Sequence, residues 1–319
     1  MPKRKLLFSA PFRFLTEEIE EYTKHFSIDF CEIWSQQELE QLDLDYDYWI
    51  PNPGQNFIID EKILENFDYL KIVSTPSTGT NHINIKDCED SLVSVYGLLD
   101  NRAELNKISA SAEFTFLKIL SSIRNLDLAW SEVKDGRWRH NEDQLRGYEI
   151  KELSFGFIGM GRIGTNLVRY LKAFDSKRMV YYDPQVNLDE SLITKVDSVE
   201  KVFNQSDVVT VCAVLNDETF GIITFEQLRL MKKNSFLINT SRGELIDEND
   251  LIKVLDERKD ISFSADVIVG EVINEHMSNP LVELHKSGRI NLTPHIAGAT
   301  YGSQTHAAIT ALENILINA

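Results

Sequence analysis

Three side chains that lie far apart in the sequence, Arg242, Glu271 and His295, could act together on a 2-keto acid. Arg242 can bind a carboxylate and polarise the adjacent ketone through a bidentate fork, which a lysine cannot form. His295 can exchange a proton near neutral pH. A contact with Glu271 would stabilise the imidazolium and raise the pKa of His295. These groups predict reduction of a ketone without a metal ion, because the guanidinium supplies the electrophilic stabilisation.

Each of these side chains also has a purely structural interpretation. Arg242 could pair with Glu244 or Asp247 where a helix begins. Glu271 could be solvated surface, and His295 could be a structural histidine. The catalytic interpretation is favoured because strands buried on both faces rarely end in ionisable groups unless a ligand needs them.

A glycine-rich segment at 155–164 gives the strongest local signal. Its GxGxxG pattern follows an apolar strand and opens an amphipathic helix. The first glycine permits a tight turn, the second lets the backbone approach a pyrophosphate, and the third lets the helix pack on the strand. The helix N-terminus offers free N–H groups to the diphosphate, and an arginine there could add a cation. The predicted contacts are Gly159, Gly161, Arg162, Ile163 and Gly164.

An acidic residue, Asp183, ends the next apolar segment of the chain. Its carboxylate would accept hydrogen bonds from the adenosine ribose hydroxyls and would repel a 2′-phosphate. This position therefore predicts NAD as the cofactor rather than NADP. The alternative is that Asp183 only starts a turn with Pro184.

From Leu153 onward, apolar strands alternate with amphipathic helices, which is typical of a doubly wound parallel sheet. Ligands of such sheets bind outside the carboxyl ends of the strands. Besides the residues above, these ends carry Cys212, Ala213, Thr240 and Asp266. We predict strands at 153–158, 179–182, 208–213, 236–239, 261–267 and 290–293, and helices at 164–174, 224–231 and 248–257.

The first hundred residues also alternate apolar runs with amphipathic stretches, which predicts a second parallel sheet. Segment 49–54 holds two prolines and a glycine and predicts a loop. A helical period over 108–125 follows, and 135–137 predicts a turn. The expected strands are 5–9, 28–33 and 70–74, and the expected helices are 15–25, 61–66 and, at the end of the chain, 301 to about 317.

The composition disfavours several classes of partner. The 319 residues carry a formal net charge of −17, which opposes non-specific binding to nucleic acid or anionic membranes. The three cysteines form no CxxC pair, which argues against a disulfide framework or a zinc site and favours a reducing cytoplasm. The apolar run at the N-terminus is shorter than a signal peptide's core, and no stretch is long enough to cross a bilayer.

Several separate motifs resemble the D-isomer-specific 2-hydroxyacid dehydrogenase family, over nearly the whole chain. Segment 155–164 is similar to its cofactor fingerprint, 238–243 to the segment with its catalytic arginine, 265–271 to its Asp-Val-x-x-x-Glu stretch, and 292–298 to its catalytic-histidine motif. The chain departs from the family at Val272, where proline is usual, and at Ser77, where a loop glycine is usual. It departs again at Cys212-Ala213, where Pro-Leu is usual.

The resemblance implies a role for individual residues. Arg242, Glu271 and His295 would be the catalytic groups, and Asp266 would contact the nicotinamide carboxamide. Segment 77–84 resembles a loop whose backbone N–H groups bind the substrate carboxylate. The implied substrate contacts are Ser77, Thr78, Gly79, Arg242 and His295, and the further cofactor contacts are Thr115, Cys212, Ala213, Thr240 and Gly298.

The resemblance also implies an α/β fold of two domains with parallel sheets. A Rossmann-type, doubly wound NAD-binding domain (108–295) would be inserted into a smaller, flavodoxin-like substrate domain (1–107 plus 296–319). Segments 108–125 and 137–139 resemble the family's dimer arm, so a homodimer is expected. In the substrate loops, Asn52, Gln55 and His82 could contact a polar tail, whereas Lys71 and Arg102 form no phosphate-binding cluster. The sequence leaves open which 2-keto acid is bound.

Two other classes of protein use a similar scaffold. An NAD-sensing corepressor is the main alternative, but it would not need Arg242, Glu271 and His295 together. An S-adenosylmethionine methyltransferase is disfavoured, because the full GxGxxG with a following acid suits a dinucleotide.

Overall fold

The computed structural model describes residues 3–15, 17–189, 191, 193–272 and 278–319. The chain forms two compact units. Unit 1 comprises the described residues of Met1–Ile108, Glu271–Glu275 and Ala299–Ala319, and unit 2 those of Ser109–Gly270 and His276–Gly298. No helix in the described part of the chain is both long and apolar enough to span a bilayer.

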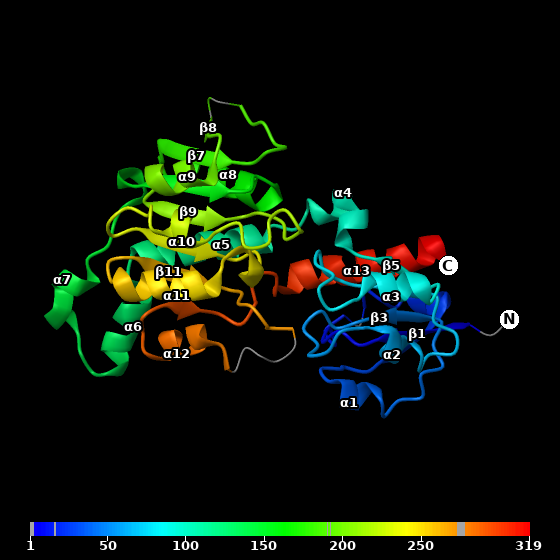
Figure 1. Ribbon diagram of the computed structural model, residues 1–319. Helices are drawn as coiled ribbons and strands as arrows, with labels where there is room; N and C mark the ends of the chain where they lie inside the picture. The colour runs from blue at the N-terminus through cyan, green and yellow to red at the C-terminus, as the bar shows by residue number, and fades with distance from the viewer. Residues whose placement is uncertain (1–2, 16, 190, 192, 273–277) are drawn as a thin grey trace. The chain divides into compact units, whose positions relative to one another are not determined.

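Unit 1 is built on a five-stranded parallel sheet in the flavodoxin-like order β2-β1-β3-β4-β5. The C-terminal helix α13, red in Figure 1, packs against β3 and β4 of this sheet. Successive strand residues point to opposite faces, so Leu6 packs in the core that α13 covers and Leu7 packs in the other core. The strands are β1 (Arg4–Phe8), β2 (Phe26–Phe30), β3 (Tyr48–Ile50), β4 (Ile72–Ser74) and β5 (Ser94–Tyr96). The helices are α1 (Gln36–Leu39), α2 (Glu61–Leu64), α3 (Ile85–Asp90), α4 (Arg102–Leu105) and α13 (Tyr301–Asn318).

Two expectations for unit 1 are wrong. The segment expected to be a loop, 49–54, begins inside β3, because its prolines follow the buried strand Tyr48–Ile50 and do not interrupt it. The helix expected over 15–25 is absent from the described residues, where only a 3₁₀ turn at Tyr22–Lys24 forms. Four glutamates at 17, 18, 20 and 21 would place like charges three and four residues apart on an α-helix, which is destabilising.

Unit 2 contains a seven-stranded parallel sheet in the order β12-β11-β10-β9-β6-β7-β8. Numbered within the unit, this is the Rossmann order 3-2-1-4-5-6 with one strand added beyond the sixth. The predicted α/β class with two parallel sheets is confirmed, and the six predicted strands of this half are all present. The strands are β6 (Ser154–Ile158), β7 (Arg178–Tyr182), β8 (Thr194–Lys195), β9 (Val208–Val211), β10 (Phe236–Asn239), β11 (Ser262–Ala265) and β12 (Asn291–Leu292).

Helices cover both faces of this sheet, as a doubly wound fold requires. On one face α5 packs against α8, β10 and β11, and Ile119 and Leu167 share a core with Phe155. On the other face Val202, Leu228 and Leu251 share a second core. The helices are α5 (Ala110–Ile123), α6 (Leu126–Lys134), α7 (Glu142–Leu145), α8 (Arg162–Ala173), α9 (Val199–Gln205), α10 (Phe225–Leu228), α11 (Glu248–Glu257) and α12 (Pro280–Lys286).

Candidate functional site

The glycine-rich loop joins β6 to α8 at the carboxyl edge of the sheet in unit 2. Gly159 has a φ of +87°, and a Cβ atom there would lie 2.6 Å from the backbone of Ala213. A Cβ atom at Gly161 would meet no atom within 4 Å, so the space beside its backbone is open. At Gly164 it meets Gly159 O at 3.1 Å. The loop therefore has the tight turn, the open backbone and the close helix packing that a pyrophosphate site requires.

Arg162 is the first residue of α8 and directly follows Gly161 in the sequence. Ile163 is the second residue of the helix. Burial lowers the pKa of the Arg162 guanidinium below its ordinary value. The helix has twelve residues, so its N-terminus carries free N–H groups and a partial positive charge. This arrangement fits the diphosphate of a dinucleotide.

Asp183 follows β7 and contacts the glycine-rich loop directly. Its Oδ2 accepts a hydrogen bond from Met160 N at 2.8 Å, and its Oδ1 accepts from Gln185 N at 2.8 Å and Val186 N at 2.9 Å. Burial opposes ionisation, but the three backbone donors prevail and hold the pKa of Asp183 below its ordinary value. The carboxylate thus does start a turn, and it is also fixed as an anion against the loop.

The end of β9 packs against the same loop. Cys212 N donates to Ile158 O at 2.7 Å, which places Cys212 and Ala213 beside Gly159. Burial raises the pKa of the Cys212 thiol to about 12. The side chain is therefore a neutral, apolar wall of the site and not a nucleophile.

Arg242 follows β10 on a turn that its neighbours hold rigidly. Asn239 accepts from Ser241 N at 3.0 Å and donates to Arg242 O at 2.8 Å. A Cβ atom at Gly243 would lie 2.3 Å from the carbonyl carbon of Ile268, so only glycine fits there. The half-buried guanidinium donates to Ser241 O at 2.6 Å, and in the part of the chain that the structure describes it forms no ion pair with Glu244 or Asp247.

Asp266 follows β11 and organises the segment that carries His295. Its fully buried carboxylate accepts from Thr293 Oγ1 at 2.5 Å, Ile296 N at 3.1 Å and Ala297 N at 2.7 Å. Its carbonyl accepts from His295 N at 2.8 Å. His295 is exposed and has a φ of +51°, an unfavourable conformation for a residue other than glycine.

The turn of Arg242 follows β10 and the turn of His295 follows β12, at the same carboxyl edge of the sheet and with β11 between them. Strands β10 and β11 pair in parallel, and Asp266 N donates to Asn239 O at 2.9 Å. The role of Thr293 was not predicted from the sequence. The signal available for it was its place two residues before the histidine, at the end of the strand predicted over 290–293.

Two threonines connect α5 to the same edge. Thr115 Oγ1 and Thr240 Oγ1 are 2.7 Å apart, and Thr115 also donates to Ser111 O at 2.6 Å. A Cβ atom at Gly298 would meet Ser111 Oγ at 3.9 Å. The predicted contacts Thr115, Thr240 and Gly298 therefore gather at the start of α5.

The remaining predicted site residues belong to unit 1. Ser77 Oγ donates to Gly79 O at 2.6 Å and lies 2.9 Å from Thr75 Oγ1, so the serine in the glycine position stiffens this loop. His82 is buried, with Nε2 at 3.0 Å from Thr75 Oγ1. Thr78 lies in the same loop. Glu271 is half-buried, and its contact with His295 remains a prediction.

The two side chains expected to reach a substrate tail from segment 49–55 are both buried. Asn52 Nδ2 donates to Ile33 O at 2.9 Å and its Oδ1 accepts from Gly54 N at 2.9 Å. Gln55 Nε2 donates to Phe57 O at 3.1 Å. These amides stabilise the loop itself.

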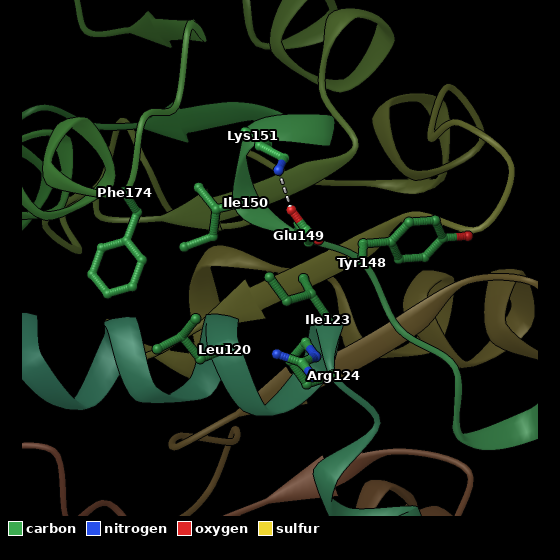
Figure 2. Close-up of a pocket in the computed structure, with 8 residues that line it drawn as sticks. All are labelled: Leu120, Ile123, Arg124, Tyr148, Glu149, Ile150, Lys151 and Phe174. Atoms are coloured by element: carbon green, nitrogen blue, oxygen red, sulfur yellow. Dashed lines mark ion pairs between the residues drawn. The ribbon is translucent and has the colours of Figure 1, made fainter. Parts of the chain in front are cut away.

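A separate pocket of about 250 Å³ lies at the opposite, amino edge of the sheet in unit 2 (Figure 2). The end of α5, the segment before β6 and the end of α8 form its walls. Figure 2 shows Glu149 and Lys151 pointing toward each other as an ion pair at 2.5 Å. The pocket contains none of the predicted site residues. Its lining is Leu120, Ile123, Arg124, Tyr148, Glu149, Ile150, Lys151 and Phe174.

Comparison with known proteins adds independent information. Residues 116–297 match the model of the "D-isomer specific 2-hydroxyacid dehydrogenase, NAD binding domain" family. A glyoxylate reductase of Thermofilum pendens is 32% identical over 266 residues, covering 81% of this chain and 74% of that protein. A D-3-phosphoglycerate dehydrogenase of Methanocaldococcus jannaschii is 30% identical over 284 residues, covering 88% of this chain and 51% of that protein. The D-lactate dehydrogenase of Aquifex aeolicus, solved with NAD and lactic acid, superposes with a TM-score of 0.79 at 23% identity and covers 98% of this chain and 94% of its own.

Proposed function

Because this chain belongs to the D-isomer-specific 2-hydroxyacid dehydrogenase family, and is an NAD-dependent oxidoreductase, we propose that it moves a hydride between NAD(H) and a small D-2-hydroxy acid or 2-keto acid. The observation that carries the proposal is the shared sheet edge of Arg242 and His295. The half-buried guanidinium of Arg242 has no carboxylate partner within the described residues. The turn of His295 is hydrogen-bonded to Asp266 at the end of β11, the strand next to β10. A substrate carboxylate is the anion that this cation lacks.

The glycine-rich loop and Asp183 would hold the cofactor. The open space beside Gly161 and the N-terminus of α8 fit the diphosphate, and the ionised Asp183 fits the ribose hydroxyls. When bound, NAD(H) supplies the hydride acceptor or donor. The fixed negative charge of Asp183 would oppose a 2′-phosphate, so NAD is preferred over NADP. Thr115, Cys212 and Thr240 would form the wall next to it.

We assign the reaction to three side chains. Arg242 binds the carboxylate and polarises the ketone oxygen, which stabilises the charge that develops there during hydride transfer. His295 gives the proton to that oxygen in reduction and removes it in oxidation. For Glu271 we retain the role that the family resemblance implies, which is to be the carboxylate partner of the His295 imidazole. The loop Ser77–Gly79 would add backbone donors to the carboxylate.

The substrate we propose is a short 2-keto acid of the size of glyoxylate, without a phosphate group. Segments 51–56 and 75–84 contain no arginine or lysine, and Asn52, Gln55 and His82 are buried. A phosphorylated substrate needs a cation for its dianion. Relatives named glyoxylate reductase agree with this choice, whereas the relative named D-3-phosphoglycerate dehydrogenase represents the alternative.

We further propose that the protein is a homodimer, paired through α5 and α6 of unit 2. Large apolar side chains of this region are exposed, which is unusual for a monomer surface. Trp130 is 57% exposed, Val133 54% and Leu117 51%. Arg137 beside them forms a bidentate ion pair with Glu132 that fixes the end of α6. A second copy of the chain would cover these side chains.

The cysteines support a reducing compartment, and we place the protein in the cytoplasm. Cys31, Cys88 and Cys212 are all free thiols. Burial raises the pKa of Cys88 to about 11, so it is inert toward disulfide exchange.

The test is a screen of NADH oxidation against 2-keto acids. We expect glyoxylate and hydroxypyruvate to be reduced with a kcat/KM at least about 10-fold above that of phosphohydroxypyruvate, because one unmet charged contact is worth about that much. A preference for the phosphorylated acid would contradict the substrate assignment. Absence of turnover with every acid, with NADH bound, would contradict the proposed reaction.

A further inference from the structure

A lysine is buried inside unit 2, close to the segment that carries His295. Lys118 lies on α5 and is only 4% exposed. Lysine is almost never buried unless it is paired. Lys118 forms no ion pair among the described residues; its Nζ instead donates a hydrogen bond to the amide Oδ1 of Asn291.

Asn291 is the first residue of β12, which is only two residues long. Its register partner on β11 is Ser264, and Ser264 Oγ also donates to Asn291 Oδ1 at 3.4 Å. Among the described strands β12 pairs only with β11, at the lateral edge of the sheet. Two register pairs and a bond from Leu292 N to His285 Nδ1 hold this short strand, and the bond from Lys118 adds a direct link to it from α5.

The chain leaves β12 directly into the proposed site. Thr293 N donates to Ala265 O at 3.0 Å, Thr293 Oγ1 donates to the Asp266 carboxylate, and His295 N donates to Asp266 O. The φ of +51° at His295 costs free energy and persists only where the surroundings hold it. The bond between Lys118 and Asn291 lies just upstream of this strained turn.

We propose that Lys118 is a positioning residue: through Asn291 it fixes β12, and thereby holds the Thr293–His295 turn in the geometry that proton transfer needs. This inference rests on the proposed function of His295. It gives Lys118 no contact with substrate. It explains why a helix that packs on an apolar core carries an amino group on its buried face.

The charge of Lys118 adds a pH dependence. Burial lowers its pKa to about 8, against the opposing effects of Asp266 on the β11 side and Asp127 at the start of α6. Its other described neighbours on β11 and β12, Ser264 and Asn291, do not titrate. Above that pH the amine is neutral and holds Asn291 and the Asp266 carboxylate less firmly.

The test compares Lys118→Met with Asn291→Leu and with the double variant. We expect each single change to lower kcat for keto-acid reduction about 10-fold with less than a 2-fold change in KM for NADH, since one hydrogen bond to a charged group is lost. The double variant should be no slower than either single variant. The alkaline decline in kcat should be steeper in wild type than in Lys118→Met near pH 8, because only wild type contains the Lys118 amine, whereas any decline caused by the proton donor itself is common to both. Lys172→Met is the matched control, because Lys172 is a helix lysine that donates to Ser191 O on the surface.

A second measurement does not depend on catalysis. Amide hydrogen exchange at Leu292 and His295 should be about 10-fold faster in Lys118→Met than in wild type, with no change in the strands β6 and β9. If Lys118→Met does not fold, Lys118→Gln serves in its place. Unchanged exchange, or losses in kcat that multiply in the double variant, would overturn the inference. An inactive wild type with the expected exchange would instead overturn the proposed function alone.

Discussion

The amino and carboxyl edges of the seven-stranded sheet in unit 2 hold buried and partly buried polar groups in different ways. At the amino edge, Lys232 Nζ lies 3.2 Å from Asp207 and donates to Ser154 Oγ at 3.0 Å. Asp207 also accepts from Ser154 N at 2.8 Å. Every charge in this cluster has a partner of opposite sign, as a structural ion pair requires.

At the carboxyl edge, backbone N–H groups and the Thr293 hydroxyl hold the carboxylates, and the Arg242 guanidinium has no carboxylate partner among the described residues. Asp183 and Asp266 each accept bonds from the main chain, and Arg242 donates only to a carbonyl among the described residues. This edge also contains the left-handed His295. The strained turn of His295 and the Arg242 guanidinium, which lacks a carboxylate partner among the described residues, indicate a ligand site at the carboxyl edge. The charge pair at the amino edge stabilises the fold.

The largest expected effect is at His295. Replacing it with alanine should lower kcat for keto-acid reduction about 10²- to 10⁴-fold, because proton transfer is lost, with the Kd for NADH unchanged. Stopped-flow turnover and NADH fluorescence titration measure the two quantities. His25→Ala, at an exposed histidine of unit 1, is the control. If His295→Ala retained wild-type turnover, the strained turn would have a structural role and no catalytic role.

Arg242→Lys should be next in size. It keeps the charge but removes the fork, so we expect kcat/KM to fall about 10- to 100-fold, with KM raised and kcat lowered. Steady-state kinetics with the preferred keto acid measures both. The matched control is Arg229→Lys, at an exposed arginine that pairs with Glu226 on the same helix. Wild-type kinetics in Arg242→Lys would show that the guanidinium of Arg242 does not bind the substrate carboxylate through its fork.

Much of this edge could be predicted from the sequence because its demands are local. A tight turn with a close approach needs glycine at 159, and a strand followed by an acid predicts the ribose contact. Thr115 and Lys118 show the limit. The helical period over 108–125 predicted an apolar face, and its buried face includes these two polar residues. Their partners Thr240 and Asn291 are more than a hundred residues away, so no local pattern reveals the contacts.

The missed strands have a similar cause. β8 is the two-residue pair Thr194–Lys195 and β5 has only three residues, Ser94–Tyr96, so both are too short for a period, and Tyr48–Ile50 is followed at once by proline. All three are strands because a neighbour supplies the hydrogen bonds: β7 for β8, β4 for β5, and β1 and β4 for β3. Sheet edges and short strands are therefore properties of the assembled fold more than of their own residues.

Asp183→Ala tests the part of the carboxyl edge where the cofactor would bind. It removes both the ribose acceptor and the anion, so we expect the Kd for NADH to rise about 10-fold and the preference for NADH over NADPH to shrink. Fluorescence titration with each cofactor measures this. Asp189→Ala is the control, because Asp189 accepts from Ser191 N in a similar turn without touching the glycine-rich loop. An unchanged cofactor preference would reduce Asp183 to a turn residue.

The smallest effect on activity is expected at the amino edge, where the effect should be on stability. Asp207→Asn breaks the charge pair with Lys232 and should lower the free energy of unfolding by about 1–3 kcal/mol, with less than a 2-fold change in kcat. Burial opposes ionisation of Asp207, but its bonds to Ser154 and Lys232 hold its pKa below the ordinary value.

The pH dependence gives this prediction a definite sign. The contribution of Asp207 to stability is present above its unfolded pKa, about 3.8, and is lost as the pH falls through the lower folded value. Urea unfolding between pH 7 and pH 2 should therefore bring wild type and Asp207→Asn closer together in acid. Asp256→Asn, at an exposed partner of Lys259, should change nothing measurable. A loss of kcat in Asp207→Asn comparable to that in Arg242→Lys would show that the two edges are coupled and that their division into a stabilising and a catalytic edge is wrong.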